Sequence, residues 1–141
     1  MEFTFAIKPN QQSIFLTDHF METYTEMYDI PHAREICFVT HELVINAVEA
    51  MEREGLTESI EVYVRNEEGD LCVTVTDYAE GIPKEQWQSM LTNNMDEENF
   101  CERGRGFFFI QQMVDELWFE QLPDSQFLVG VKKKLVMAEE M

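Results

Sequence analysis

Residues 31–55, PHAREICFVTHELVINAVEAMEREG, decide the fold, because apolar side chains recur in them every three or four positions. This spacing predicts a helix with one buried face, which has Pro31 in its first turn and ends at Gly55. Glu42 and Asn46 lie four residues apart and therefore project from one face of that helix, about one turn apart. They are either part of its solvated side or two oxygen donors that converge on a bound metal–phosphate group. The expected buried stripe comprises Ile36, Val39, Leu43, Ala47, Ala50 and Met51.

The rest of the chain predicts hairpin strands with helices between them. The expected strands are residues 2–8, 59–66, 71–76, 117–121 and 126–136. The other expected helices are residues 11–28, residues 84–91 and one that begins near Gly104 and carries Phe107, Ile110, Met113, Val114 and Leu117. Strands grouped in this way favour a two-layer α/β (α+β) sandwich, in which helices cover one face of a mixed, largely antiparallel sheet.

The composition indicates one folded domain with an acidic surface. At 141 residues, 45% of them apolar, the chain is long enough for a single domain, residues 1–141, with its own core. Its formal net charge of -18 argues against binding to nucleic acid or to an anionic membrane, since both would repel it. A phosphate ligand would therefore have to be held by a metal ion, backbone N–H groups and a few placed cations.

The cysteines and the lack of targeting signals indicate a reduced, cytoplasmic protein. Cys37, Cys72 and Cys101 are odd in number and widely spaced, and without a C-x-x-C pair they favour neither a disulfide framework nor a zinc site. The N-terminus carries no basic leader followed by an apolar run, and no segment approaches the length of a membrane span.

Two further segments combine residue types that suit a nucleotide. Residues 77–81, DYAEG, follow an apolar strand, where a carboxylate can accept a hydrogen bond from an exocyclic amine and a glycine lets the backbone approach a flat ring. Residues 104–106, GRG, open a helix, where unpaired N–H groups and an arginine suit phosphate. The alternatives are an ordinary turn for the first segment and a flexible hinge for the second. Between them, residues 82–103 are mostly polar, which predicts a mobile lid.

Other polar groups have simpler explanations. His41 and Glu42 do not begin an H-E-x-x-H metal motif, because Ile45 stands where the second histidine would be. We expect His41 to have a structural role or to lie at the edge of a pocket. The basic run 132–134 in the last strand is expected to form a solvated or edge-protecting cluster.

In this order, the helix motif and the two glycine segments resemble the N-box and the two glycine boxes of the GHKL superfamily of ATP-binding domains. That superfamily includes gyrase, the heat-shock chaperone ATPase, histidine kinases and mismatch-repair ATPases. Residues 42–47, ELVINA, and residues 104–117, GRGFFFIQQMVDEL, are similar to the small anti-sigma-factor serine/threonine kinases of bacteria. The resemblance covers nearly the whole chain. It implies a Bergerat-type ATP-binding fold with ATP and Mg²⁺ as ligands.

The resemblance also implies roles for individual residues. Glu42 would be the general base, and Asn46 would help to hold Mg²⁺. Asp77 would contact the adenine amine, and Arg105 would contact the phosphates. The glycines that would shape the pocket and its lid are Gly81, Gly104 and Gly106.

Two functions remain open at this point. The resemblance implies a protein kinase that phosphorylates a small anti-anti-sigma partner, sequesters a sigma factor, or does both, and that forms homodimers. The alternative is a non-catalytic module that binds ATP or ADP and titrates a protein partner. The family usually has glycine at the position of Ala79, and related kinases often have a polar or basic residue at the position of Ala50. These two alanines and the acidic run 96–98 favour the alternative, so nucleotide binding is the firmer prediction and catalysis stays a hypothesis.

Overall fold

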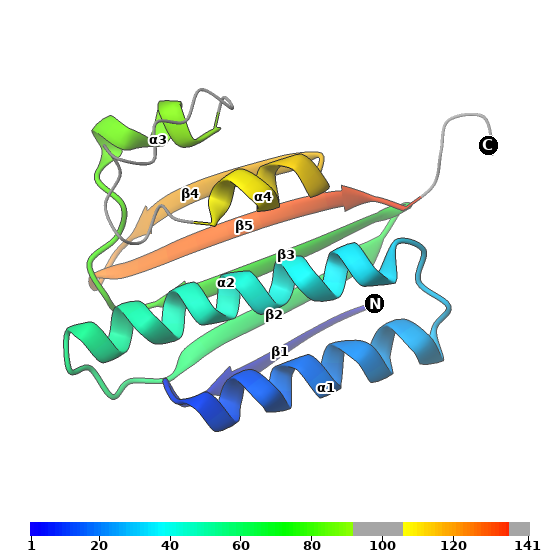
Figure 1. Ribbon diagram of the computed structural model, residues 1–141, viewed down its shortest axis with the longest axis horizontal. Helices are drawn as coiled ribbons and strands as arrows, with labels where there is room; N and C mark the ends of the chain where they lie inside the picture. The colour runs from blue at the N-terminus through cyan, green and yellow to red at the C-terminus, as the bar shows by residue number, and fades with distance from the viewer. Residues whose placement is uncertain (92–105, 136–141) are drawn as a thin grey trace.

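The computed structural model, which describes residues 1–91 and 106–135, contains a five-stranded sheet in the order β1-β2-β3-β5-β4. Each pairing between neighbouring strands is antiparallel. The strands are β1 (Glu2–Ile7), β2 (Ile60–Glu67), β3 (Asp70–Asp77), β4 (Glu116–Leu122) and β5 (Gln126–Lys134). The helices are α1 (Gln11–Met27), α2 (Ala33–Arg53), α3 (Lys84–Leu91) and α4 (Phe107–Met113). Helices α1, α2 and α4 lie on the same face of the sheet (Figure 1), and this arrangement confirms the predicted two-layer sandwich.

The alternation of side chains along the strands explains why helices cover one face. In β2, Ile60, Val62 and Val64 are fully buried, whereas Glu61 and Arg65, which alternate with them, are exposed. Successive side chains of a strand point to opposite faces, so the apolar set faces the helices and the polar set faces outward. The register continues this division into β1, where Phe3 and Phe5 pair with the inward-facing Val64 and Val62.

Helix α2 packs its predicted apolar stripe against the inner face of the sheet. The stripe is buried as expected and is widened by Thr40, Val44 and Val48. The helix begins at Ala33, after His32 in a left-handed conformation. Pro31 therefore lies in the turn before the helix and not in its first turn, which corrects the sequence-based start.

The region after α4 differs from the prediction. Helix α4 ends at Met113, because Val114 adopts an extended conformation (φ -119°, ψ 162°). The next residue, Asp115, already donates its backbone N–H to the carbonyl of Lys132 in β5, at 2.8 Å. Val114 and Leu117 therefore do not belong to the helix, since pairing with β5 is available to the chain as soon as it becomes extended.

Among the described residues, none of the helices has the length and apolarity that crossing a membrane requires.

Met51 provides a test of this packing, because its side chain is fully buried between α2 and the sheet. Met51→Ala is expected to lower the free energy of unfolding by about 2–5 kcal/mol, since it leaves a cavity. Met51→Leu nearly conserves the volume and should cost less than about 1.5 kcal/mol. Urea denaturation of both variants measures the two losses. Equal losses would contradict the packing of Met51 in the core.

Candidate functional site

Glu42 and Asn46 lie on the partly exposed side of α2, one turn apart, as their spacing predicted. Gly106 immediately precedes α4 and lies close to Glu42: a Cβ at Gly106 would be 3.7 Å from Glu42 Oε2. Gly106 has a φ of +91°, in the left-handed region that glycine adopts without strain. The structure therefore brings together the predicted base, the predicted magnesium ligand and the glycine at which α4 starts.

Asp77 marks the second part of the candidate site, at the far end of β3. It is the last residue of that strand and not the first residue after it, and its side chain is only 1% exposed. Its Oδ1 accepts a hydrogen bond from the backbone N–H of Ala79, at 2.9 Å. This contact fixes the carboxylate within its own turn. An ionised carboxylate has several acceptor sites, so it can also accept a hydrogen bond from an exocyclic amine.

The turn that follows Asp77 is attached to the C-terminal end of α2. The backbone N–H of Tyr78 donates to Met51 Sδ at 3.3 Å, and that of Glu80 donates to Glu54 Oε2 at 2.7 Å. Helix α2 therefore carries Glu42 and Asn46 and also holds the turn that follows Asp77.

Gly81 is needed for packing, which the sequence did not reveal. A Cβ at Gly81 would lie 2.2 Å from Cδ1 of Phe127, a ring that is fully buried. The start of the expected lid is held nearby, since Trp87 Nε1 donates to the carbonyl of Ile82 at 2.7 Å and its ring lies 5.7 Å from that of Phe119. Gly81 thus places the chain between the Asp77 turn and α3 directly against the core.

Part of the predicted site lies outside the described residues. This part comprises Gly104, Arg105 and residues 92–103 of the expected lid.

Within residues 1–91 and 106–135, no three His, Cys, Asp or Glu side chains are grouped to hold a metal ion. The amide oxygen of Asn46, with the Glu42 carboxylate one turn away, fits Mg²⁺, which takes one or two protein groups together with phosphates and water.

One contact beside the site was not predicted. His41 Nδ1 lies 2.8 Å from Asp18 Oδ1 and 3.0 Å from Asp18 Oδ2, so it joins α1 to α2 next to Glu42. The sequence indicated a structural or pocket-edge role for His41, which agrees with this pair. The partner could not be read from the sequence, because the two residues are 23 positions apart on different helices.

Comparison with known structures shows the class of fold. The chain resembles the nucleotide-free catalytic domain of the histidine kinase ThkA, with a TM-score of 0.55 over 96% of each chain and a sequence identity of 14%. The family described as "Histidine kinase-like ATPase domain" matches residues 16–130. The chain therefore belongs to the histidine kinase-like ATPase domain family, and this membership supports ATP binding and a kinase-like or regulatory role. A comparison with curated proteins found no match.

The contact between Gly81 and Phe127 can be tested by a double-mutant cycle. Gly81→Ala is expected to lower the free energy of unfolding by about 1–3 kcal/mol, because the added methyl overlaps the buried ring. In a Phe127→Leu background the same change should cost at least about 0.5 kcal/mol less, since the smaller side chain leaves room. Urea denaturation of the four proteins gives the coupling. Additive losses would show that the two residues do not constrain each other.

Proposed function

We propose that the chain is an Mg-ATP-binding serine/threonine protein kinase of the anti-sigma-factor type, which phosphorylates a small anti-anti-sigma protein, sequesters a sigma factor, or does both. The observation that carries this proposal is the approach of Gly106 to Glu42, one helical turn from Asn46, in a chain of the histidine kinase-like ATPase family. A carboxylate at this place can accept a proton from a hydroxyl group that enters between α2 and α4.

The proposed reaction is a phosphoryl transfer. The hydroxyl oxygen of a serine or threonine in the partner forms a bond to the γ-phosphorus of ATP, and the bond from that phosphorus to the β–γ bridging oxygen breaks. Glu42 takes the hydroxyl proton, and ADP leaves. Most of the rate enhancement in such reactions comes from positioning and charge stabilisation, so the placement of Glu42 by α2 matters as much as its basicity.

Charge is the main difficulty for this reaction, because the chain carries a net charge of -18. Asn46 would hold Mg²⁺ jointly with the phosphates, and the ion supplies positive charge where negative charge accumulates. Asn46 is itself uncharged and adds no repulsion. By the family resemblance, Arg105 adds a cation at the phosphates.

A non-catalytic regulatory module that binds ATP or ADP is the second candidate. The family resemblance raises it through Ala50, because related kinases often have a polar or basic residue at this position. Such a module would bind the same nucleotide through Asn46 and Asp77 and would titrate its partner without phosphorylating it.

The first test separates these functions through Glu42. Glu42→Gln should bind Mg-ATP with a Kd within about threefold of wild type, because the amide keeps the shape of the side chain. It should lower phosphate transfer about 100-fold or more, because it removes the proton acceptor. Glu49→Gln, an exposed change on the same helix, is the matched control and should leave both quantities unchanged.

The measurements are calorimetry with Mg-ATP and transfer of label from γ-labelled ATP to small anti-anti-sigma-like proteins from the same genome. Labelled partner with wild type and with Glu49→Gln, but not with Glu42→Gln, supports the kinase. Tight binding without transfer by the wild type supports the non-catalytic module, and failure to bind Mg-ATP refutes both.

The second test examines the base of the nucleotide through Asp77. Asp77→Asn keeps an Oδ1 that can accept from Ala79, but it also gains an amide that can donate to O6 of guanine. The ratio of the GTP Kd to the ATP Kd is expected to fall about tenfold or more. Competition calorimetry with the two nucleotides measures it. An unchanged ratio would show that Asp77 does not contact the base.

A further inference from the structure

Lys133 is a charged residue in a row of apolar side chains, on the face of β5 that the helices cover. Along β5, the alternating residues Phe127, Val129 and Val131 are buried against the helices, and Lys133 is the next member of that series. Its side chain is 18% exposed. It does not belong to a solvated cluster with its neighbours, as the basic run had suggested. An ammonium group on the covered face of a sheet needs polar partners, since burying it unpaired would be costly.

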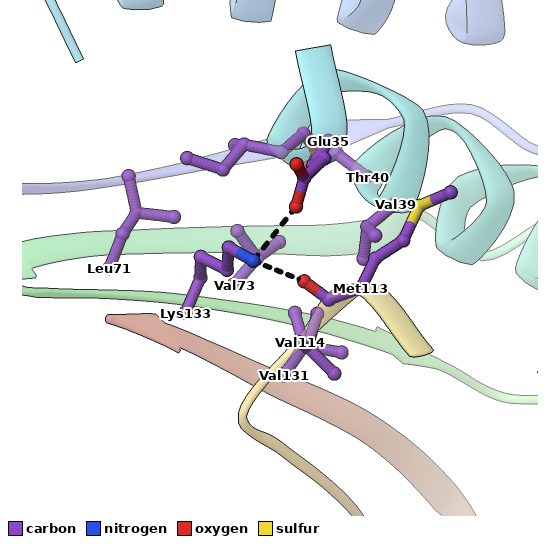
Figure 2. Close-up of a pocket in the computed structure, with 10 residues that line it drawn as sticks. Glu35, Val39, Thr40, Leu71, Val73, Met113, Val114, Val131 and Lys133 are labelled. Atoms are coloured by element: carbon purple, nitrogen blue, oxygen red, sulfur yellow. Dashed lines mark hydrogen bonds and ion pairs between the residues drawn. The ribbon is translucent and has the colours of Figure 1, made fainter. Parts of the chain in front are cut away.

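The partners of Lys133 come from two different helices. Its Nζ donates to Glu35 Oε2 at 2.8 Å and to the backbone carbonyl of Met113 at 2.7 Å (Figure 2). Glu35 lies in the first turn of α2, and Met113 is the last residue of α4. By donating its hydrogen bond, the Lys133 ammonium holds the pKa of the Glu35 carboxyl below its ordinary value. Lys133 therefore connects β5, α2 and α4 at one point.

The bond to Met113 is the more consequential of the two. The Glu35 side chain is 43% exposed, so its ion pair is screened by water and stabilises little. The carbonyl at the C-terminal end of a helix, in contrast, lacks a partner within the helix and is favoured by a cation. The hollow beside Lys133, lined mainly by apolar side chains, has a volume of about 10 Å³ and room for about one water molecule.

The other end of α4 lies at the candidate site. The helix has seven residues, and Gly106 at its start approaches Glu42. Phe107 and Ile110 are buried and hold α4 on the core, whereas Lys133 holds its final carbonyl. Because α4 has only about two turns, we expect the release of its final carbonyl to tilt the helix about Phe107 and Ile110 and to move Gly106.

We propose that Lys133 is a positioning residue for the nucleotide site. By holding the C-terminal end of α4 to β5, it sets the distance between Gly106 and Glu42. This inference rests on the proposed function, because it takes the space beside Glu42 to be where the nucleotide binds.

The test compares two substitutions of Lys133 with a matched change at its neighbour. Lys133→Met keeps an unbranched apolar stem but has no donor, and Lys133→Arg keeps a charged donor. Lys132→Met is the control, because Lys132 pairs with Asp70 and Glu116 on the outer face of the sheet. The Kd for Mg-ATP should rise about tenfold in Lys133→Met, the scale of one charge-assisted hydrogen bond, and stay within about threefold of wild type in Lys133→Arg and Lys132→Met.

Hydrogen exchange of the backbone amides is the second measurement, and it requires no ligand. Lys133→Met should speed exchange in α4 and leave exchange in α2, β3 and β5 unchanged. A wild-type Kd in Lys133→Met overturns the proposal, as does acceleration spread evenly over α2, β3 and β5, which indicates a general loss of stability. If the wild type binds no nucleotide, the proposed function fails, and the exchange pattern alone then decides whether Lys133 holds α4.

Discussion

The burial of one face of α2 against the sheet is the constraint on which the rest of the structure depends. With Leu43, Ala47 and Met51 in the core, the rotation of the helix is fixed. Glu42 and Asn46 are then carried to the side that meets the start of α4. A rotation of one residue would turn the Glu42 carboxylate toward the core, where an unpaired charge is costly. The interaction that stabilises the fold therefore also directs the candidate site.

The inner face of the sheet is apolar at its centre and carries a charged residue at each end. In the β3–β5 register, Asp77 lies opposite Phe127 and Lys133 lies opposite Leu71, so the two charged residues are at opposite ends. Helix α2 spans the distance between them: its C-terminal end is bonded to the turn after Asp77, and its first turn to Lys133. Asp77 accepts a bond within the turn at one end of α2, and Lys133 donates to the last residue of α4 near the other end.

The sequence predicted what depends on local periodicity. The stripe of α2, the hairpin strands and the two-layer sandwich follow from repeats of 3.6 and 2 residues, and the structure agrees with them. The start of α2 after Pro31 was not predicted, because the geometry of the preceding turn decides it. The end of α4 at Met113 was not predicted either, because long-range pairing with β5 decides it. The requirement for Gly81 and the partners of Lys133 depend on residues distant in sequence, Phe127 and Glu35, which one sequence without a fold cannot bring together.

The structure changes the meaning of the two alanines that had favoured a non-catalytic module. Ala50 is 1% exposed and Ala79 is 3% exposed, so both methyl groups face the core. A long basic side chain at position 50 would have to displace the contact between α2 and the sheet, and that contact aims Glu42 and Asn46. A small residue at position 50 thus serves the packing of this chain. Its lack of charge therefore does not by itself argue against phosphate binding.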